Sequence, residues 1–468
     1  MAQSLRGRVR DRLFAGRELV DRVARHSPAR LAVTVFAAVI AVFTVLLLPP
    51  WATASGERAA FVDALFTAVS AVCVTGLVVQ DTGTYWSGYG LTVILVGIKV
   101  GGLGVMTLAS ILGLAVSRRL GLTQRLLTAS ETKTDKLGEV GSLLRVVIVT
   151  ATLIELSIAV LLFPRFLVLN ESVGEAAWHA VFYGVSAFNN AGFVPDAGML
   201  EHVGDWWLCV PIALGVFVGS LGFPVILNLM RSRPRLGTRR RWQAGWSLHT
   251  RLTLVTSTAL LVVGSVLLLV LEWNNPRTFG PLAFGEKLLA GFFAGVMPRS
   301  GGFSTVDIGA MSQSSWLLQD ALMFVGGGSA STAGGIKVTT LAVMLLAIAA
   351  EARGDRDIEA YGRRIPRDTL RLSIAVVFVG ATAVLVSCVA LLEITGLQLS
   401  VVLFEALSAF ATVGLSTGIT PGLPDAAKYV LCALMFVGRT GTMTFAAALA
   451  IRDRRRIVRF PEERPIIG

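Results

Sequence analysis

Hydrophobic positions along the chain form long and short apolar segments in an order that repeats four times: long, short, long. A helix needs about 20 apolar residues to cross a bilayer, so the long segments predict crossings and the short ones predict helices that enter the membrane without crossing it. The long segments cover residues 31–50, 88–116, 143–163, 205–230, 251–272, 315–350, 371–393 and 427–451. The short segments cover residues 60–73, 175–188, 285–297 and 402–411.

A turn of related sequence ends each short segment. The turns read C-V-T-G-L, N-N-A-G-F, R-S-G-G-F and A-T-V-G-L, and their shared glycines, 116, 110 and 112 residues apart, are Gly76, Gly192, Gly302 and Gly414. A single glycine turn in an apolar chain is usually a helix break or a packing contact, but four in phase indicate internal repetition. The period fits parallel repeats of a two-span unit around an axis along the membrane normal.

The predicted fold class is therefore an all-α integral membrane protein. Its four tandem helix–pore-loop–helix units are expected to surround one pore with fourfold pseudosymmetry. The units cover residues 31–116, 143–230, 251–350 and 371–451. A basic N-terminal segment (1–30) and a C-terminal tail (452–468) flank them, and both are predicted to be cytoplasmic.

Composition and charge support a chain surrounded by lipid. The 468 residues are 54% hydrophobic and 15% charged, whereas soluble proteins carry about 25% charged residues. The net charge of +12 could suggest nucleic-acid binding, but 33 of the 42 Lys and Arg residues lie in segments 1–30, 117–146, 231–251, 351–371 and 452–468. These segments flank the apolar spans at every second loop, which is the positive-inside pattern. We therefore predict cytoplasmic termini and no nucleic-acid partner.

The four turns predict a cation site made of backbone carbonyls. Non-helical backbone at membrane depth is tolerated only where protein or a water-filled path satisfies its polar groups. Four turns meeting on one axis would form a ring of carbonyl oxygens that can replace the hydration shell of a monovalent cation. Glycine permits the positive-φ conformations that such a ring needs. The predicted filter comprises Cys73, Val74, Thr75, Gly76, Asn189, Asn190, Ala191, Gly192, Arg299, Ser300, Gly301, Gly302, Ala411, Thr412, Val413 and Gly414.

Acidic residues recur near both ends of the short segments. Those that follow the first three turns would concentrate cations at the outer mouth of a pore, and they are Asp81, Asp196 and Asp307. Those at or near the start of the short segments are Asp63, Glu175, Glu286 and Glu405. For this second group, helix capping is the simpler interpretation.

A stretch rich in glycine and serine interrupts the sixth long segment and predicts an unwound loop below the filter. Lys337 at its end would repel cations and suits a movable barrier, although its ammonium group could instead reach the inner interface. Arg439, at the matching depth of the fourth unit, could donate to carbonyls of the loop. The predicted gate comprises Gly326, Gly327, Gly328, Ser329, Ala330, Ser331, Thr332, Ala333, Gly334, Gly335, Lys337 and Arg439.

Other features of the long segments admit more than one interpretation. The glycine clusters at 101–104 and 219–222 could line the pore or allow close helix packing. Glu155 lies inside the third long segment and either pairs with a basic residue or faces a subunit interface. Lys99 precedes the first glycine cluster and either alters the pore lining or pairs with a neighbour.

Taken together, the four turns, the Gly-Gly-Leu-Gly cluster at 101–104, the Ser-Thr-Ala-Gly-Gly-Ile-Lys stretch ending at Lys337 and the Gly-Arg-Thr-Gly at 438–441 resemble the Trk/Ktr/HKT potassium transporters. The resemblance runs from about residue 31 to the C-terminus and is greatest for KtrB-type membrane subunits. It implies K⁺ uptake through a channel-like pore in the plasma (inner) membrane, with K⁺ as the transported ion and no organic cofactor in this chain.

The resemblance also implies how the pore is controlled. It predicts a homodimer and a cytosolic KtrA/TrkA-like ring that binds nucleotides and regulates the gate. Glycine in all four turns is the K⁺-favouring pattern, and activation by Na⁺ stays open. Two residues depart from the family pattern: Lys99 stands where a neutral residue is expected, and Gly301 precedes the third filter glycine where alanine is commoner.

Two other classes of protein are alternatives to this interpretation. A carrier with broken helices, using Glu155 as its site, would show two related halves rather than four parallel units. A membrane-embedded hydrolase would need a nucleophile such as Ser329 and a histidine base. His26, His202 and His249 fall in predicted loops or segments at the membrane surfaces, and His179 starts a predicted pore helix. No H-E-x-x-H metal motif is present in the sequence, so we predict that the chain is not an enzyme.

Overall fold

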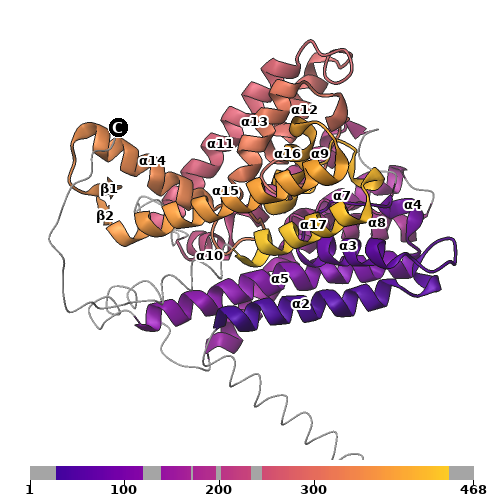
Figure 1. The fold of residues 1–468 in the computed structure, drawn as a ribbon, viewed down its shortest axis with the longest axis horizontal. Helices are drawn as coiled ribbons and strands as arrows, with labels where there is room; N and C mark the ends of the chain where they lie inside the picture. Colours follow the sequence, from indigo (N-terminus) through magenta and orange to yellow (C-terminus); the bar gives the residue numbers. More distant parts are fainter. Residues whose placement is uncertain (1–27, 120–138, 170–171, 197–201, 233–244, 442–468) are drawn as a thin grey trace, which may run out of the picture.

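The structure is a computed structural model that describes residues 28–119, 139–169, 172–196, 202–232 and 245–441. These ranges exclude the predicted tail 452–468, nearly all of segment 1–30 and most of the clustered Lys and Arg residues. The regular secondary structure of the described residues is almost entirely helical (Figure 1).

The first two predicted units contain eight α-helices and one short 3-10 helix among the described residues. They are α2 (Pro28–Leu47), η1 (Pro50–Ala52), α3 (Phe61–Val72), α4 (Thr82–Tyr85), α5 (Gly88–Arg119), α7 (Glu139–Leu169), α8 (Val173–Phe188), α9 (Trp206–Leu221) and α10 (Phe223–Arg231), so that the short helix η1 links α2 to α3.

The last two units have the same order of long and short helices. They contain α11 (Leu248–Glu272), α12 (Phe284–Val296), η4 (Ile308–Ala310), α13 (Gln313–Phe324), α14 (Val338–Arg353), α15 (Arg367–Thr395), α16 (Leu399–Phe410), η5 (Thr420–Gly422), α17 (Asp425–Phe436) and η6 (Val437–Gly441).

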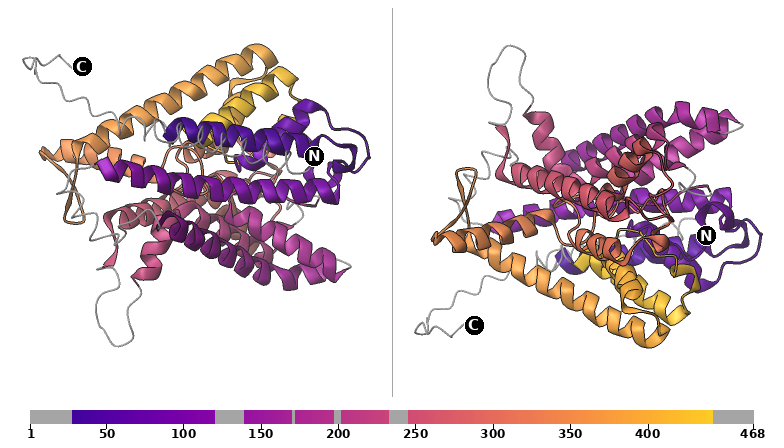
Figure 2. Two further views of the ribbon diagram at one scale, coloured as in Figure 1. Left: turned by 90° about the horizontal axis from the view of Figure 1, so that it is seen from below. Right: turned by 90° about the horizontal axis from the view of Figure 1, so that it is seen from above.

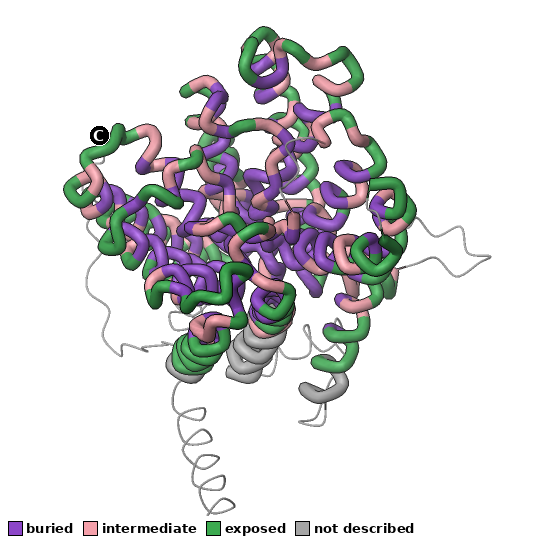
Figure 3. The backbone as a smooth tube through the Cα atoms, turned by 90° about the vertical axis from the view of Figure 1, so that its right-hand side faces the viewer, coloured by how far each residue is buried: buried purple, intermediate pink, exposed green. Residues whose placement is uncertain are grey.

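The predicted short helices are present and lie inside the molecule. Helices α3 and α16 bury most of their residues and α8 and α12 about half, and buried residues fill the centre of the molecule in Figure 3. The long helices α5, α7 and α15 run from one end of the molecule to the other around them (Figure 2). The long helices leave apolar side chains exposed on the outside, for example Val160, Val270 and Phe378. A surface of this kind suits contact with lipid.

By length and composition, three described helices can each cross a membrane: α7, α11 and α15. The pair α9 and α10 adds a fourth if the two are counted as one span, although they meet at an angle of 95° at Gly222. Helices α13 and α14 are separated by the glycine-rich stretch, as the sequence predicts. The eight predicted crossings remain a prediction.

The all-α prediction misses one element, a β-hairpin in the predicted cytoplasmic segment 351–371. Strand β1 (Ile358–Ala360) pairs antiparallel with β2 (Arg363–Ile365). Tyr361 and Gly362 between them have φ of +54° and +72°, the pattern of a two-residue type I′ turn. Ile358 and Ile365 are buried against residues of α11 and α14, so tertiary packing stabilises a hairpin too short to form alone.

A buried ion pair joins the first and fourth units. Lys428 on α17 donates to Asp63 on α3 at 2.9 Å, and Gln80 donates to the other carboxylate oxygen of Asp63 at 2.9 Å. The prediction that Asp63 caps its helix is wrong, because its carboxylate pairs with Lys428. The two residues are 365 positions apart, so no local pattern predicts their contact.

Candidate ion-binding site

The four turns share one backbone conformation. The second residue of each turn has a positive φ, of +56° at Val74, +60° at Asn190, +69° at Ser300 and +48° at Thr412. The four glycines have φ of +92° at Gly76, +69° at Gly192, +76° at Gly302 and +94° at Gly414. Positive φ is uncommon outside glycine, so its recurrence at one position of all four turns indicates a common structure for the carbonyls.

The glycines bring the turns into contact in a closed order. A Cβ atom added at Gly76 would lie 2.2 Å from the carbonyl oxygen of Ala191, and one at Gly192 would lie 2.7 Å from the Cα of Gly302. A Cβ added at Gly302 would lie 2.6 Å from the carbonyl oxygen of Val413. One added at Gly414 would lie 2.2 Å from the carbonyl oxygen of Thr75, which returns to the first turn. The contacts therefore run through all four turns and close on themselves.

Buried serines lie behind three of the turns, six residues before the glycine. Ser70 Oγ accepts a hydrogen bond from the Gly76 N–H at 3.0 Å, and Ser408 Oγ accepts one from the Gly414 N–H at 3.1 Å. Ser186 Oγ instead donates to the carbonyl of Phe193 at 2.8 Å. The third unit has Val296 at this position. These serines were not predicted, although their fixed distance from each glycine is visible in the sequence.

The first residue of each turn points to a different partner. Arg299 is 2% exposed and donates from its two terminal nitrogens to Ser257 on α11, to the carbonyl at 2.6 Å and to Oγ at 3.0 Å. Asn189 donates to Glu155 on α7 at 2.8 Å. Cys73 and Ala411 fill this position in the other turns and are buried. The terminal nitrogens of Arg299 are therefore held by α11.

The three predicted outer-mouth acids all have intramolecular partners. Asp81 caps α4 by accepting from the Thr84 N–H at 2.9 Å, and Asp307 accepts from the Gly309 N–H at 2.9 Å. Asp196 accepts from the Tyr183 hydroxyl at 2.8 Å. These bonds fix the chain just after the turns. A role in attracting cations stays a prediction for all three.

The predicted capping role holds for one acid of the second group and fails for another. Glu286 on α12 accepts from the Ala283 N–H at 2.9 Å, as in a capping box. Glu405 lies in the middle of α16, is 1% exposed, and accepts from the Thr417 N–H and the Thr420 hydroxyl at 3.1 Å each, as well as from the Ser416 hydroxyl. Its carboxylate therefore holds the segment that follows the fourth turn.

Glu175 lies in the first turn of α8 and is exposed. Its backbone N–H, rather than its side chain, takes part in the cap, by donating to Ser172 Oγ at 3.2 Å. A carboxylate at this place is favourable because it interacts with the positive end of the helix dipole.

The predicted gate loop is a compact irregular segment packed below the turns. Val325 and Ile336 form a bridge at its neck. Lys337 Nζ turns back and donates to the carbonyl of Ala333 at 2.6 Å, instead of extending toward the inner interface. Arg439 donates to the carbonyl of Thr332. Both cations are therefore held by carbonyls of the loop itself.

Hydrogen bonds connect this loop to two of the turns. Thr332 Oγ1 donates to Asn190 Oδ1 at 2.8 Å, and the Gly334 N–H donates to Ser300 Oγ at 3.3 Å. Ser300 Oγ itself donates to the carbonyl of Thr412 at 2.7 Å. A displacement of the loop would therefore break bonds to the second and third turns.

The loop also fits into the break between α9 and α10. The Gly328 N–H donates to the carbonyl of Ser220 at 2.7 Å, and the Phe223 N–H donates to the carbonyl of Ala330 at 3.2 Å. Gly222 has φ of +90°, and a Cβ there would lie 2.5 Å from the carbonyl oxygen of Ser329. Glycine is therefore required at this bend for conformation and for space.

The other glycine clusters serve close packing. A Cβ at Gly101 would lie 2.0 Å from the carbonyl oxygen of Val72, and one at Gly219 would lie 2.0 Å from that of Phe188. A Cβ at Gly438 would lie 1.7 Å from the carbonyl oxygen of Phe410. In each of these three units the carbonyl belongs to the last residue of the short helix. This supports the packing interpretation of the first two clusters, because each glycine lies against the end of a short helix.

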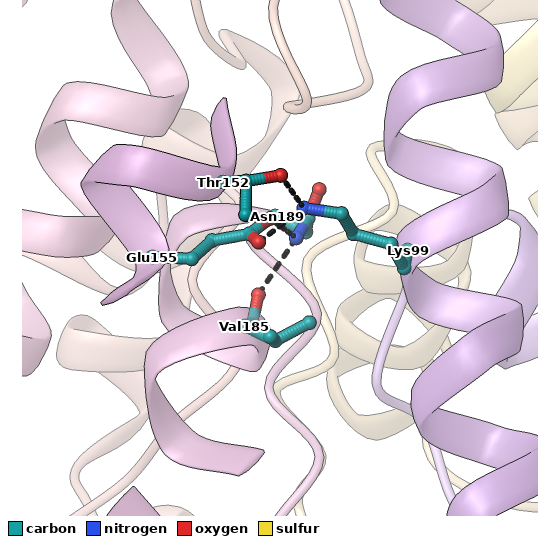
Figure 4. Close-up of polar contacts among 5 residues, drawn as sticks. All are labelled: Lys99, Thr152, Glu155, Val185 and Asn189. Carbon is teal, nitrogen blue, oxygen red and sulfur yellow. Dashed lines mark hydrogen bonds and ion pairs between the residues drawn. The ribbon is translucent and has the colours of Figure 1, made fainter. Parts of the chain in front are cut away.

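Lys99 and Glu155 contact each other at the junction of the first two units (Figure 4). Lys99 on α5 also donates to Thr152 Oγ1 on α7 at 3.1 Å. Glu155 is 4% exposed and receives Asn189 Nδ2 on its other oxygen. Of the alternatives given above for Glu155 and for Lys99, pairing is the one observed for both.

Among the described residues, no group of three or more His, Cys, Asp or Glu side chains could hold a metal ion. The oxygen atoms that the turns bring together are backbone carbonyls. These are ligands suited to a monovalent cation that is only partly dehydrated.

Comparisons with known proteins give the family. The profile of the TrkH family, described as a cation transport protein, matches residues 26–456. The Ktr system potassium uptake protein B of Bacillus subtilis (strain 168) is 35% identical, with 97% of this chain and 99% of that protein covered. The potassium/sodium uptake protein NtpJ of Enterococcus hirae is 32% identical, with 95% and 98% covered. The chain belongs to the Trk/Ktr family of cation transport proteins.

A solved structure supports the fold. The potassium transporter TrkH from Vibrio parahaemolyticus superposes with a TM-score of 0.67 at 17% sequence identity, covering 89% of this chain and 84% of that one. At this identity the likeness concerns the fold alone. Together with the apolar helices, the family membership makes this chain a multi-pass membrane protein.

Proposed function

We propose that this protein takes up K⁺ through a single pore whose filter is the ring of the four turns. The observation that carries the proposal is the closed order of contacts from Gly76 to Gly192, Gly302 and Gly414 and back to the first turn. The names of its relatives, potassium uptake proteins that match over nearly their full length, support K⁺ as the ion. One relative is a potassium/sodium uptake protein, so Na⁺ belongs in every transport assay.

Four units with fourfold pseudosymmetry would place the ends of the short helices around one axis. The four short helices end directly before the turns, so the negative ends of their dipoles would face a cation below the filter. The carbonyls of the turns would replace part of its hydration shell. The repeated backbone conformation of the turns supports this arrangement.

The segment 326–337 with Arg439 would act as the gate below this filter. Support comes from the bonds of Lys337 and Arg439 to carbonyls of the loop. In this arrangement two cationic groups lie near the path, where they would repel K⁺ until the loop moves. The hydrogen bonds from Thr332 to Asn190 and from Gly334 to Ser300 would open when it does.

The proposed assembly is a homodimer in the plasma membrane, with both termini cytoplasmic and a cytosolic KtrA/TrkA-like nucleotide-binding ring on the gate side. The basic segments between the units support this orientation. The name of the Bacillus subtilis relative, a protein of the Ktr system, supports a partner.

The proposal is tested by Rb⁺ uptake into proteoliposomes with K⁺ and Na⁺ as competitors, in the wild type and in Gly76→Ser and Gly418→Ser. Gly76 and Gly418 have φ of +92° and +93°, but a Cβ at Gly418 meets nothing within 4 Å. The two variants therefore share the backbone strain, and only Gly76→Ser disturbs the ring. We expect K⁺-selective uptake that Gly76→Ser abolishes or makes unselective and that Gly418→Ser preserves. Absence of cation uptake by the wild type, with or without a regulatory subunit, would contradict the proposal.

A further inference from the structure

We infer that the Lys99–Glu155 ion pair is a positioning device that fixes the second turn through the amide of Asn189, and so contributes to ion selectivity. The inference rests on the proposed function, because it assigns a task to the turn only if the turns form the filter. The three residues come from α5, α7 and the end of α8, and Figure 4 shows their side chains converging.

The carboxylate of Glu155 divides its two oxygens between two units. One oxygen accepts a hydrogen bond from the ammonium group of Lys99 in the first unit, and the other accepts one from Asn189 Nδ2 of the second turn at 2.8 Å. Asn189 Nδ2 also donates to the carbonyl of Val185 at 2.9 Å. The first residue of the turn is thereby tied to the neighbouring unit as well as to its own helix.

The charge of Glu155 determines which way the Asn189 amide points. An ionised carboxylate only accepts hydrogen bonds, so it selects Nδ2 and directs Oδ1 the opposite way. Oδ1 faces α5, where a Cβ at Gly102 would lie 2.1 Å from it. Asn189 is fully buried, and among the described residues its Oδ1 has no hydrogen-bond donor. The amide is therefore fixed by the carboxylate on one side and by the space above Gly102 on the other.

Lys99 supplies the opposite charge beside the Glu155 carboxylate at membrane depth. An isolated charge at membrane depth is costly, and removal of one partner of a buried ion pair strongly destabilises the folded protein. The next residue, Asn190, has a positive φ and binds both the carbonyl of Val216 at 3.2 Å and Thr332 of the loop. A shift of Asn189 would therefore reach the carbonyls of the turn and the loop below it.

The pair lies on the outside of the turn. It borders a cleft of about 290 Å³ between α5, α7 and α8, whose walls include the exposed side chains of Val96, Leu156 and Val181. The Lys99 side chain is 25% exposed. Ions in the proposed ring would not contact this pair, so its effect on selectivity must pass through Asn189.

The matching positions of the other turns show that this device is particular to the second turn. Cys73 and Ala411 are small and buried, and Arg299 carries its own charge to Ser257. Only the second turn, among these four, depends on a charge pair whose two members lie outside the turn.

The test compares Lys99→Gln, Glu155→Gln and the double variant in reconstituted Rb⁺ uptake, with the ratio of the apparent KM values for Na⁺ and Rb⁺ as the readout. We expect each single variant to lower this ratio by roughly tenfold, within the range that contacting residues show in double-mutant cycles. The double variant removes both charges and is expected to recover most of the ratio. Arg165→Gln is the matched control, because Arg165 on the same helix α7 forms a 2.5 Å pair with Asp205 that contacts no turn.

A double-mutant cycle with Asn189→Ala separates positioning from a general loss of structure. If the pair acts through the amide, Glu155→Gln has no further effect on the ratio in the Asn189→Ala background. An unchanged KM ratio in both single variants would overturn the inference. An equally large fall of the KM ratio in Arg165→Gln would also overturn it, as would a full additive effect of Glu155→Gln on this ratio in the Asn189→Ala background. The proposed function would survive those results, provided that the wild type is selective and Gly76→Ser is not.

Discussion

The first and fourth turns form one pair in their local structure, and the second and third turns form another. In the first pair a serine oxygen accepts the glycine N–H, the glycine φ values are +92° and +94°, and buried leucines, Leu77 and Leu415, follow. In the second pair the glycine φ values are +69° and +76°, and buried phenylalanines, Phe193 and Phe303, follow. A fourfold sequence pattern therefore contains a difference between two kinds of turn.

The difference lies in how each turn is held. The first and fourth turns have small residues at their first position and rely on the serine behind them and on backbone packing. The second and third turns use long polar side chains, Asn189 and Arg299, to reach α7 and α11. These two turns also form direct hydrogen bonds with the gate loop. We therefore expect the first pair to govern the rigidity of the filter and the second pair to transmit movements of the gate.

The largest effect is expected where the first and fourth units meet. Lys428→Met would leave Asp63 buried without its cation, which costs about 3–5 kcal/mol. The apparent melting temperature of the detergent-solubilised protein should fall substantially. Lys287→Met is the control, because Lys287 donates to a carbonyl and lies over the Trp273 ring instead of pairing with an acid. Equal melting temperatures for the two variants would contradict this account of the junction.

Removal of the serine oxygens should affect the first and fourth turns alike. Ser70→Ala and Ser408→Ala would each leave a buried glycine N–H without an acceptor, at a cost of about 1–3 kcal/mol. We expect a similar loss of thermal stability and of Rb⁺ over Na⁺ preference in both variants. If only one of the two variants lost selectivity, the pairing of these turns would be wrong.

The same substitution in the second turn should have a smaller effect. Ser186→Ala removes a donor to the Phe193 carbonyl and leaves the glycine N–H unaffected. The expected cost is about 0.5–1.5 kcal/mol, the net value of one hydrogen bond. Measured beside Ser70→Ala in the same melting and uptake assays, it shows whether the two kinds of turn differ. A loss as large as that of Ser70→Ala would remove the distinction.

The smallest effect on stability, with a distinct effect on transport, is expected for Thr332→Val. The variant loses the hydroxyl bond from the gate loop to Asn190 and keeps the Arg439 bond to the Thr332 carbonyl. The cost should be about 0.5–1.5 kcal/mol. Uptake without a regulatory subunit should rise while the preference for Rb⁺ over Na⁺ is kept. A fall in selectivity with no gain in rate would indicate that Thr332 belongs to the filter instead.

Local patterns were sufficient to predict the short helices and the turns. The predicted segments 60–73, 175–188, 285–297 and 402–411 correspond to α3, α8, α12 and α16 within three residues at each end. Apolar runs of limited length and a glycine at a fixed place are local properties, so the chain itself displays them. The shared positive φ at the residue two positions before each glycine follows from the same repetition.

The polar contacts between units were not predictable in this way. Asp63 stands thirteen residues before Gly76 and Glu405 nine before Gly414, so the two acids are out of phase and were wrongly grouped as caps. Asp63 binds Lys428, which lies 365 positions later in the sequence. Glu155 binds residues from two other helices. Which helices become neighbours is decided by packing of the complete fold, and a single sequence does not display it.

The central claim is that the four glycine turns form one cation-selective ring. The most direct measurement is the K⁺ over Na⁺ preference of reconstituted Rb⁺ uptake for Gly76→Ser, Gly192→Ser, Gly302→Ser and Gly414→Ser, each compared with Gly418→Ser. Each of the four ring variants is expected to lose uptake or selectivity, because every added Cβ meets the backbone of the adjacent turn, while Gly418→Ser should behave as the wild type. Selective uptake that survives in any of the four ring variants would contradict this claim.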